Sequence, residues 1–193
     1  LEGEEVRSAR AKVNCRKKRL QAFIPLVYCF GVNWRPTGGR ALRQGASVAI
    51  ALNNRALITI YGGSGFIGRH VVRAIARSGA RMRIAVRRPE LAGFLQPLGG
   101  VGQINAVQAN VRYPDSLLAA AEDADAVVNL VGILFPSGKQ TFKSVQDEGA
   151  RHVAEAARAK GARAFVHVSA IGASHDAPHY YARSKDEGED AVR

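Results

Sequence analysis

The stretch LITIYGGSGFIGRH, residues 57–70, decides the fold. An apolar run rich in β-branched residues stops at Gly62, and a segment with apolar residues at helical spacing follows at once. Four glycines, at positions 62, 63, 65 and 68, fall within seven positions. A buried strand, a tight turn built from small residues and a helix are the opening of a βαβ unit.

The rest of the chain repeats this alternation of strand and helix. We expect strands over residues 56–61, 81–88, 104–111, 125–132 and 162–172. We expect helices over residues 66–79, 116–124, 142–161 and 180–193, with Asp115 capping the second and a glycine ending the first and third. This order predicts an α/β fold, a Rossmann-like doubly wound parallel sheet with helices on both faces. A complete domain of this kind adds another strand after its last helix. Because the pattern ends inside that helix, we expect the domain to be truncated at its C-terminus.

Charge is distributed unevenly along the chain. The net charge is +12 over 193 residues. Residues 1–55 hold 11 Lys and Arg against 3 Glu, a net of +8, whereas residues 56–193 hold 17 against 13, a net of +4. Because most of the excess lies outside the patterned region, we do not expect the folded domain to bind nucleic acid.

Residues 1–55 lack the periodicity of the remainder, and we divide the chain into this head and a domain over residues 56–193. We interpret the head as unstructured or non-native sequence, translated from upstream of a true start near Val48. Two alternatives stay open. In the first, the head is a targeting peptide, since its basic run 16–19 is followed by the apolar stretch 20–34. In the second, the head is a genuine extra segment of the protein.

The two cysteines, Cys15 and Cys29, both lie in the head. We therefore expect neither a disulfide framework nor a metal site. We also expect an intracellular domain in a reducing compartment. The apolar stretch 20–34 is shorter than a membrane span and is broken by Pro25 and Gly31, so we expect no transmembrane segment.

The glycine turn predicts a dinucleotide site. Its spacing contains the G-x-G-x-x-G pattern, and its place between strand and helix lets backbone N–H groups and the helix N-terminus face a pyrophosphate. The residues that we expect to hold the cofactor here are Gly62, Gly63, Ser64, Gly65, Phe66, Ile67 and Gly68. Arg87 and Arg88 follow the second strand, where guanidinium groups suit a 2′-phosphate, so NADP(H) is favoured over NAD(H). Asn110 follows the third strand and is a candidate for the adenine edge.

A second group of polar residues lies near the end of the chain. Tyr181 and Lys185 are four positions apart, so a helix places them on one face. A neighbouring ammonium lowers the pKa of a phenol, which prepares it to exchange a proton with a hydroxyl or carbonyl group. Ser169 ends the preceding strand, where its hydroxyl is suited to orienting the same oxygen.

These motifs resemble the short-chain dehydrogenase/reductase superfamily, in particular its extended or atypical, epimerase/dehydratase-like branch. The segments GGSGFIG, VVNLVG, FVHVSAIG and YYARSK appear in the expected order, and the resemblance covers about 70% of the chain. It implies Tyr181 as general acid/base, Lys185 as the group that bonds the nicotinamide ribose, and Ser169 as the holder of the substrate oxygen. It also implies that Asn129 and Gly132 line the cofactor.

Within that branch the chain looks most similar to the NAD(P)H-binding accessory subunits of respiratory complex I and their bacterial relatives. The resemblance implies a subunit of NADH:quinone oxidoreductase in the bacterial cytoplasm or on the mitochondrial matrix side, attached to the membrane through that complex. The segments VNLVG and VQDEGARHV depart from the usual dehydrogenase patterns, which disfavours turnover but not cofactor binding. The alternatives are an NADP(H)-dependent reductase or sugar epimerase/dehydratase that uses Ser169, Tyr181 and Lys185, and a nucleotide sensor.

Overall fold

The computed structural model describes residues 29–30 and 53–193 of the chain. The expectations for Cys15, for the apolar stretch 20–34 and for the start near Val48 lie outside these residues, apart from Cys29 and Phe30. Those two residues form a short strand, β1, that pairs antiparallel with the last strand of the sheet. In the part of the chain that the structure describes, every helix is too short or too polar to cross a bilayer.

Strands and helices alternate as the sequence predicts. The strands are β2 (Leu57–Tyr61), β3 (Arg81–Val86), β4 (Ile104–Gln108), β5 (Ala126–Asn129) and β6 (Ala164–Val168). The helices are α1 (Phe66–Ala76), α2 (Pro114–Ala120), α3 (Glu148–Ala159) and α4 (Tyr180–Ala191), with a 3₁₀ helix η1 (Pro89–Leu98) and a π-helical turn η2 (Lys143–Asp147).

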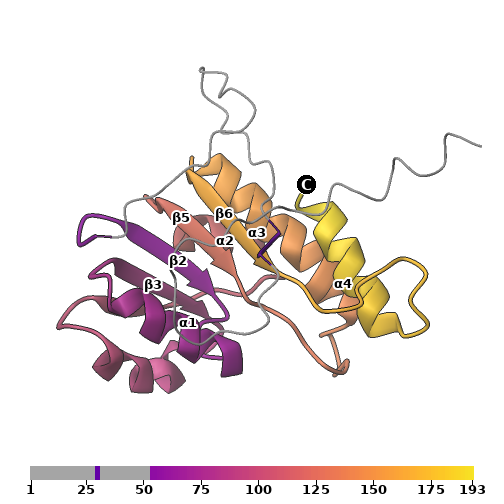
Figure 1. Ribbon diagram of the computed structural model, residues 1–193, viewed down its shortest axis with the longest axis horizontal. Helices are drawn as coiled ribbons and strands as arrows, with labels where there is room; N and C mark the ends of the chain where they lie inside the picture. Colours follow the sequence, from indigo (N-terminus) through magenta and orange to yellow (C-terminus); the bar gives the residue numbers. More distant parts are fainter. Residues whose placement is uncertain (1–28, 31–52) are drawn as a thin grey trace, which may run out of the picture.

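The six strands form one sheet in the order β1-β6-β5-β2-β3-β4 (Figure 1). Strands β2 to β6 are parallel, which confirms the doubly wound Rossmann-like prediction. The chain proceeds from β2 outward through β3 and β4, then returns to the other side of β2 with β5 and β6. The strand order therefore reverses between β2 and β5, and open α/β sheets bind ligands in the crevice at such a point.

Two separate apolar clusters cover the two faces of the sheet. One joins α1 and η1 to large side chains of the strands, such as Ile60, Met82 and Ile84. The other joins α2 and α3 to the opposite face, and ten of its members among the described residues are alanine. Because alanine is small, the helices on this second face lie close to the strands. Helices on both faces confirm the predicted layering.

The glycine turn allows α1 to begin directly after β2. Gly62 has φ +77°, a conformation that side chains disfavour. A β-carbon at Gly68 would lie 2.5 Å from the backbone oxygens of Gly62 and Gly63, so only glycine permits this approach of helix and turn. The N-terminus of α1 is thereby fixed at the end of β2.

Three details differ from the sequence-based expectations. Asp115 does not cap α2: the N-cap is Tyr113, Pro114 is the first helical residue, and Asp115 lies in the first turn. The predicted helix over 142–161 is divided into η2 and α3. No element was predicted for the segment that follows the second strand, and it forms η1 because Ala92 and Leu95 bury against the α1 face of the sheet.

Candidate functional site

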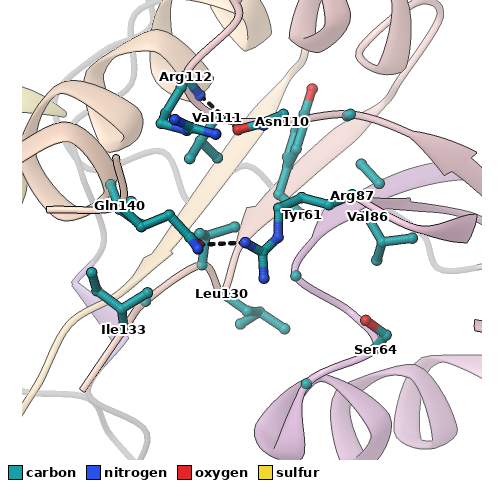
Figure 2. A pocket seen from close by; sticks show the side chains of 17 residues that line it. Tyr61, Ser64, Val86, Arg87, Asn110, Val111, Arg112, Leu130, Ile133 and Gln140 are labelled. Atoms are coloured by element: carbon teal, nitrogen blue, oxygen red, sulfur yellow. Dashed lines mark hydrogen bonds between the residues drawn. The ribbon is translucent and has the colours of Figure 1, made fainter. Parts of the chain in front are cut away.

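A pocket of about 220 Å³ lies at the carboxyl ends of β2, β3, β4 and β5, where the strand order reverses (Figure 2). Each of these strands ends in a loop that contributes to the lining. The lining residues are Tyr61, Gly62, Ser64, Gly65, Ala85, Val86, Arg87, Ala109, Asn110, Val111, Arg112, Leu130, Val131, Gly132, Ile133, Gln140 and Val145. The pocket is therefore at the place where this fold binds its ligands.

The wall of the pocket at the start of α1 is made of backbone. Gly62 and Gly65 line it, and the Gly65 N–H donates to the Gly62 carbonyl at 3.1 Å. A β-carbon at Gly65 would lie 3.2 Å from that carbonyl oxygen, so a side chain would crowd the turn. Unpaired N–H groups at the N-terminus of a helix attract an anion, and α1 carries no acidic side chain in its first turn.

Polar side chains form the opposite wall. Arg87, at the end of β3, donates to the side-chain oxygen of Gln140, which reaches across from the loop after β5 (Figure 2). Asn110 accepts from the backbone N–H of Arg112 at 3.2 Å, so its oxygen shapes the turn after β4. Arg112 also lines the pocket. Two guanidinium groups therefore border the pocket at the ends of β3 and β4.

The structure brings six of the predicted cofactor residues into this pocket. They are Gly62, Ser64, Gly65, Arg87, Asn110 and Gly132. The remaining residues predicted for the cofactor turn and the neighbouring strands are absent from the lining: Gly63, Phe66, Ile67, Gly68, Arg88 and Asn129. Gly63 and Gly68 instead provide space for packing, since β-carbons there would lie 2.7 Å from Ile84 and 2.5 Å from the turn.

Sequence reasoning did not identify Tyr61, Arg112 or Gln140. Arg112 follows Asn110 at the end of β4, so the same rule that selected Arg87 and Asn110 would have found it. Gln140 lies in a loop eleven residues after β5, and nothing in the local sequence signals its contact with Arg87. The buried hydroxyl of Tyr61 donates to the Leu117 carbonyl at 2.7 Å, and burial raises its pKa, so it is a neutral structural group.

The predicted Tyr181 and Lys185 lie on α4, which packs closely on η2. A β-carbon at Gly188 would lie 2.2 Å from the Gln146 carbonyl oxygen, so the helix approaches that backbone as only glycine allows. Lys185 is buried, and its Nζ donates to the Val168 carbonyl at 2.9 Å. Tyr181 is half-buried, with its ring edge-on to Phe142 at 6.0 Å between centroids.

Lys185 lies beside the wall of the pocket. A β-carbon at Gly132 would lie 3.8 Å from its Nζ, which places the amine behind a residue of the lining. Burial lowers the pKa of Lys185 to about 8, while nearby Glu189 opposes the shift. The amine therefore remains mainly protonated at neutral pH and releases its proton more readily than an exposed lysine.

Gln146 connects the pocket to α4. Its side-chain nitrogen donates to the Ile133 carbonyl at 2.6 Å, and its side-chain oxygen accepts from the Ser184 hydroxyl at 2.8 Å. Ile133 lines the pocket, and Ser184 precedes Lys185. This buried amide, located in a π-helical turn of the kind that often marks functional sites, fixes the two regions relative to each other.

Asn129 and His167 form a buried pair beneath this region. The Asn129 amide nitrogen lies 3.1 Å from His167 Nδ1, and its oxygen accepts from the Val131 N–H at 3.1 Å. Burial lowers the pKa of His167 to about 4, and the charge of Lys185 adds to the effect. In the described part of the chain, His167 Nε2 and Ser169 Oγ are buried without a hydrogen-bond partner. An unpartnered serine oxygen suits a site that takes a polar ligand atom.

Comparison with known proteins agrees with this geometry. A model of the NAD(P)H-binding family matches residues 62–192, from the first glycine of the turn almost to the end of the chain. The chain belongs to the NAD(P)H-binding family. Its glycine turn, the N-terminus of α1 and the pocket at the strand ends are the parts of this NAD(P)H-binding domain that would hold the dinucleotide.

Curated relatives of this NAD(P)H-binding chain include enzymes and respiratory subunits. A ceramide reductase of Caulobacter vibrioides is 38% identical over 144 residues, which are 75% of this chain and 44% of that protein. The mitochondrial NADH-ubiquinone oxidoreductase 40 kDa subunit of Neurospora crassa is 30% identical, with 70% of this chain and 36% of the subunit covered. The mitochondrial NADH dehydrogenase [ubiquinone] 1 alpha subcomplex subunit 9 of Mus musculus is 32% identical, with 70% and 36% covered. The chain thus spans less than half the length of these relatives.

Solved structures confirm the fold of the NAD(P)H-binding chain. A single-residue mutant of uronate dehydrogenase from Agrobacterium tumefaciens, complexed with NAD, superposes with a TM-score of 0.54 at 23% identity, covering 70% of this chain and 54% of that one. The structure of Pen from Bacillus thuringiensis superposes with a TM-score of 0.63 at 21% identity, covering 73% and 46%. At these identities the likeness concerns the fold.

The described residues also contain one surface group of side chains able to ligate a cation. His175 and Asp190 are exposed and Asp186 is half-buried, with His175 Nε2 3.4 Å from the Asp186 carboxylate and 3.0 Å from that of Asp190. The hydrogen bond to Asp190 and the charge of Asp186 raise the pKa of His175. The three side chains are therefore engaged with one another as ion pairs.

Proposed function

We propose that the pocket binds NADP(H) in preference to NAD(H). The observation that carries the proposal is Arg87, which lines the pocket at the end of β3, where a cofactor's adenosine ribose lies in this fold. Its guanidinium is held by the neutral amide of Gln140 rather than by a carboxylate. A 2′-phosphate would offer the guanidinium a charged partner at the same place.

The test compares two neighbouring arginines. Arg88 also follows β3, but it caps η1 and does not line the pocket. We expect Arg87→Gln to weaken NADPH binding by roughly ten- to 100-fold, the loss of one hydrogen bond to a charged group. NADH affinity should change little, and Arg88→Gln should leave both affinities near those of the wild type. Equal losses for NADPH and NADH, or for both variants, would refute the role of Arg87. The affinities are measured by fluorescence titration.

For the whole protein, we propose that it is an NAD(P)(H)-binding accessory subunit of NADH:quinone oxidoreductase. Support comes from the Neurospora crassa and Mus musculus relatives, whose names place them in that complex. The buried contacts of Gln146 fit a domain that holds a cofactor in a fixed structure. Such a subunit lies in the bacterial cytoplasm or on the mitochondrial matrix side and reaches the membrane through its partners.

A native gel tests this role. The tagged full-length gene product is expressed in its own cell, and mildly solubilised membranes are separated under native conditions. Migration of the tag with NADH:quinone oxidoreductase activity supports the accessory-subunit role. Migration as a small species without that activity excludes it and leaves the enzymatic alternative.

The second candidate is a reductase acting on a carbonyl or hydroxyl group. Two observations favour it. The sequence contains all three residues, Ser169, Tyr181 and Lys185, and the chain is 38% identical to a ceramide reductase. Bound NADPH supplies a hydride for a carbonyl carbon. In this candidate, Tyr181 donates its hydroxyl proton to the carbonyl oxygen, Ser169 Oγ positions that oxygen, and the Lys185 ammonium stabilises the tyrosinate that remains.

Substitution of Tyr181 distinguishes the two candidates. If the protein is a reductase, Tyr181→Phe abolishes NADPH oxidation in the presence of a carbonyl substrate while NADPH affinity stays nearly unchanged. The expected loss of rate is about 10²- to 10⁴-fold, the contribution of one general acid, which reduces the reaction to background. If the protein only holds its cofactor, wild type and Tyr181→Phe show the same slow background rate.

A further inference from the structure

Basic residues are concentrated in the first part of the described domain. Residues 56–101 contain seven Arg and one Glu, a net charge of +6, whereas residues 102–193 contain 10 Lys and Arg and 12 Asp and Glu, a net charge of −2. The first segment runs from β2 through α1 and β3 to η1. The positive charge of the domain therefore belongs to one end of the sheet and its covering helices.

The fold gathers part of this charge on one surface, which we name the α1–η1 face. It is defined by exposed side chains of two elements: Phe66, Arg69, Arg73 and Arg77 from α1 and its C-cap, and Leu91 and Phe94 from η1. In Figure 1, α1 lies at the bottom of the view, on the other side of the sheet from α3. Helix α1 contains no acidic residue, and Glu90 is the acidic residue of η1.

Large apolar side chains stand out from the α1–η1 face. Phe66 is 76% exposed, Leu91 63% and Phe94 51%. They are not needed for the core, because α1 and η1 already bury other residues, such as Val72 and Leu95, against the sheet. Three large apolar side chains on one face, rather than a single exposed residue, indicate a surface that is covered in use.

One contact between an arginine and an aromatic ring joins the two elements of the face. The Arg69 guanidinium lies 5.8 Å from the centre of the Phe94 ring, which joins α1 to η1. Arg69, Arg73 and Arg77 then follow one another along the exposed side of α1, four positions apart. The neighbouring Arg83 is not part of this face, since it bonds the Ala120 and Glu122 carbonyls on the opposite side of the sheet.

This combination matches a surface of anionic lipid headgroups. Helices that lie in a membrane interface carry Lys and Arg on a polar face and Trp, Phe or Leu on the face that enters the boundary of the acyl chains. The α1–η1 face offers both kinds of side chain to such a surface. Each basic residue near such a surface contributes attraction to anionic lipids. A face that carries both arginines and a few apolar side chains suits a headgroup layer better than it suits the continuous apolar core of a protein interface.

We propose that the α1–η1 face docks the protein onto a membrane surface rich in anionic phospholipids, with Phe66, Leu91 and Phe94 entering the headgroup layer. The proposal is independent of whether the protein is a respiratory subunit or a reductase. Its partner is the lipid surface itself, and it needs no helix that crosses the bilayer.

The test measures binding of the full 193-residue chain to vesicles by flotation. Vesicles of phosphatidylglycerol with phosphatidylcholine are compared with vesicles of phosphatidylcholine alone. The charge variant is Arg73→Gln/Arg77→Gln on α1, and the matched control is Lys143→Gln/Arg151→Gln, which removes the same charge from exposed positions on η2 and α3. The basic head is present in every protein, so its contribution is constant across the comparison.

We expect the wild type to prefer the anionic vesicles and the α1 double variant to bind them roughly 30-fold more weakly, at about 1 kcal/mol per arginine. The control double variant should stay close to the wild type. Unchanged circular dichroism and NADPH affinity show that the variants are folded, and they separate a failure of docking from a failure of the proposed cofactor site.

A second pair tests the apolar contribution. Leu91→Ser/Phe94→Ser should weaken binding to anionic vesicles with little change in its salt dependence. Leu134→Ser/Phe135→Ser, which changes a more exposed pair in the loop after β5, should leave binding unchanged. Equal binding to neutral and anionic vesicles overturns the proposal, as does an equal loss in the two charge variants. Binding of the face to nucleic acid or to an acidic protein, with no preference for anionic vesicles, overturns it as well.

Discussion

Replacement of Gly68 by alanine tests whether the glycine turn is required for packing. The added methyl would lie 2.5 Å from the oxygen of Gly62 and from the carbonyl carbon and oxygen of Gly63. All three are backbone atoms of a turn that is itself fixed, since the Gly62 N–H donates to the Ala85 carbonyl at 3.0 Å. The contact is relieved only if α1 moves away from β2.

Two opposing effects set the size of the change. Alanine stabilises a helix interior by about 1 kcal/mol relative to glycine. Overpacking destabilises by about 1–3 kcal/mol, and three backbone contacts place Gly68→Ala at the upper end. The net loss is about 2 kcal/mol, which lowers the melting temperature by roughly 4–8 °C for a domain of this size.

Gly93→Ala in η1 is the matched control, because a β-carbon there meets no atom within 4 Å in the described structure. Thermal unfolding followed by circular dichroism compares the two variants with the wild type. We expect Gly93→Ala to melt at or slightly above the wild-type temperature, and Gly68→Ala to melt lower and to bind NADPH more weakly. A Gly68→Ala variant as stable as Gly93→Ala would refute the packing argument.

Three further predictions concern α4 and its surroundings. Gly188→Ala should lower the free energy of unfolding by about 2–3 kcal/mol, seen as a lower urea midpoint, because the added methyl would lie 2.2 Å from the Gln146 carbonyl oxygen. An unchanged midpoint would contradict the close packing of α4. His167 has a pKa of about 4 in the folded state and 6.5 in the unfolded state, so the unfolded state binds the proton first as the pH falls. The free energy of unfolding should therefore decrease by about 3 kcal/mol between pH 6.5 and pH 4. His167→Gln should flatten this part of the pH profile of urea unfolding, whereas His179→Gln, the exposed control, should retain it. Lys185 has a pKa of about 8 in the folded state and 10.5 in the unfolded state, so burial of its charge destabilises the fold fully below pH 8, and this effect disappears towards pH 10.5. Lys185→Met should raise the free energy of unfolding by about 2 kcal/mol at pH 7, once the lost hydrogen bond to the Val168 carbonyl is subtracted, and this gain should vanish at high pH. A constant difference between pH 7 and 10.5 would contradict the last assignment.

The fold was predictable because its signals are local. Each strand ends at a turn or helix marked by glycine or proline, and the strand–glycine–helix order around Gly62 predicts both the parallel sheet and the place of the pocket. The prediction that Asp115 caps α2 was wrong because Pro114 occupies the first helical position, so the helix begins one residue before Asp115. The π-helical turn before α3 was missed because helical periodicity does not distinguish it from a continuous helix.

The site was predictable only where it follows the ends of strands. Arg87, Asn110 and Gly132 lie within three residues of the ends of β3, β4 and β5, so their meeting follows from parallel topology. Gln140 and Gln146 reach their partners through loops and a turn whose course is set by tertiary packing. The roles expected of Ser169, Tyr181 and Lys185 remain predictions, which the substitution of Tyr181 tests.

The alanine-rich cluster beneath α2 and α3 has a consequence for how this protein tolerates change. Alanine has no rotamers to lose, so this half of the interior becomes ordered with little loss of side-chain entropy. Truncation has almost nothing to remove at the ten alanines, while a larger residue there pushes a helix off the strands. The larger members of the cluster, such as Leu117 and Phe165, still leave cavities when they are truncated. The α1 side, with Ile60, Met82 and Ile84, has the opposite sensitivity, because truncation leaves cavities. Random mutagenesis should therefore damage the two faces in different proportions: more often by enlargement at the alanines behind α3, and more often by truncation of the large side chains behind α1.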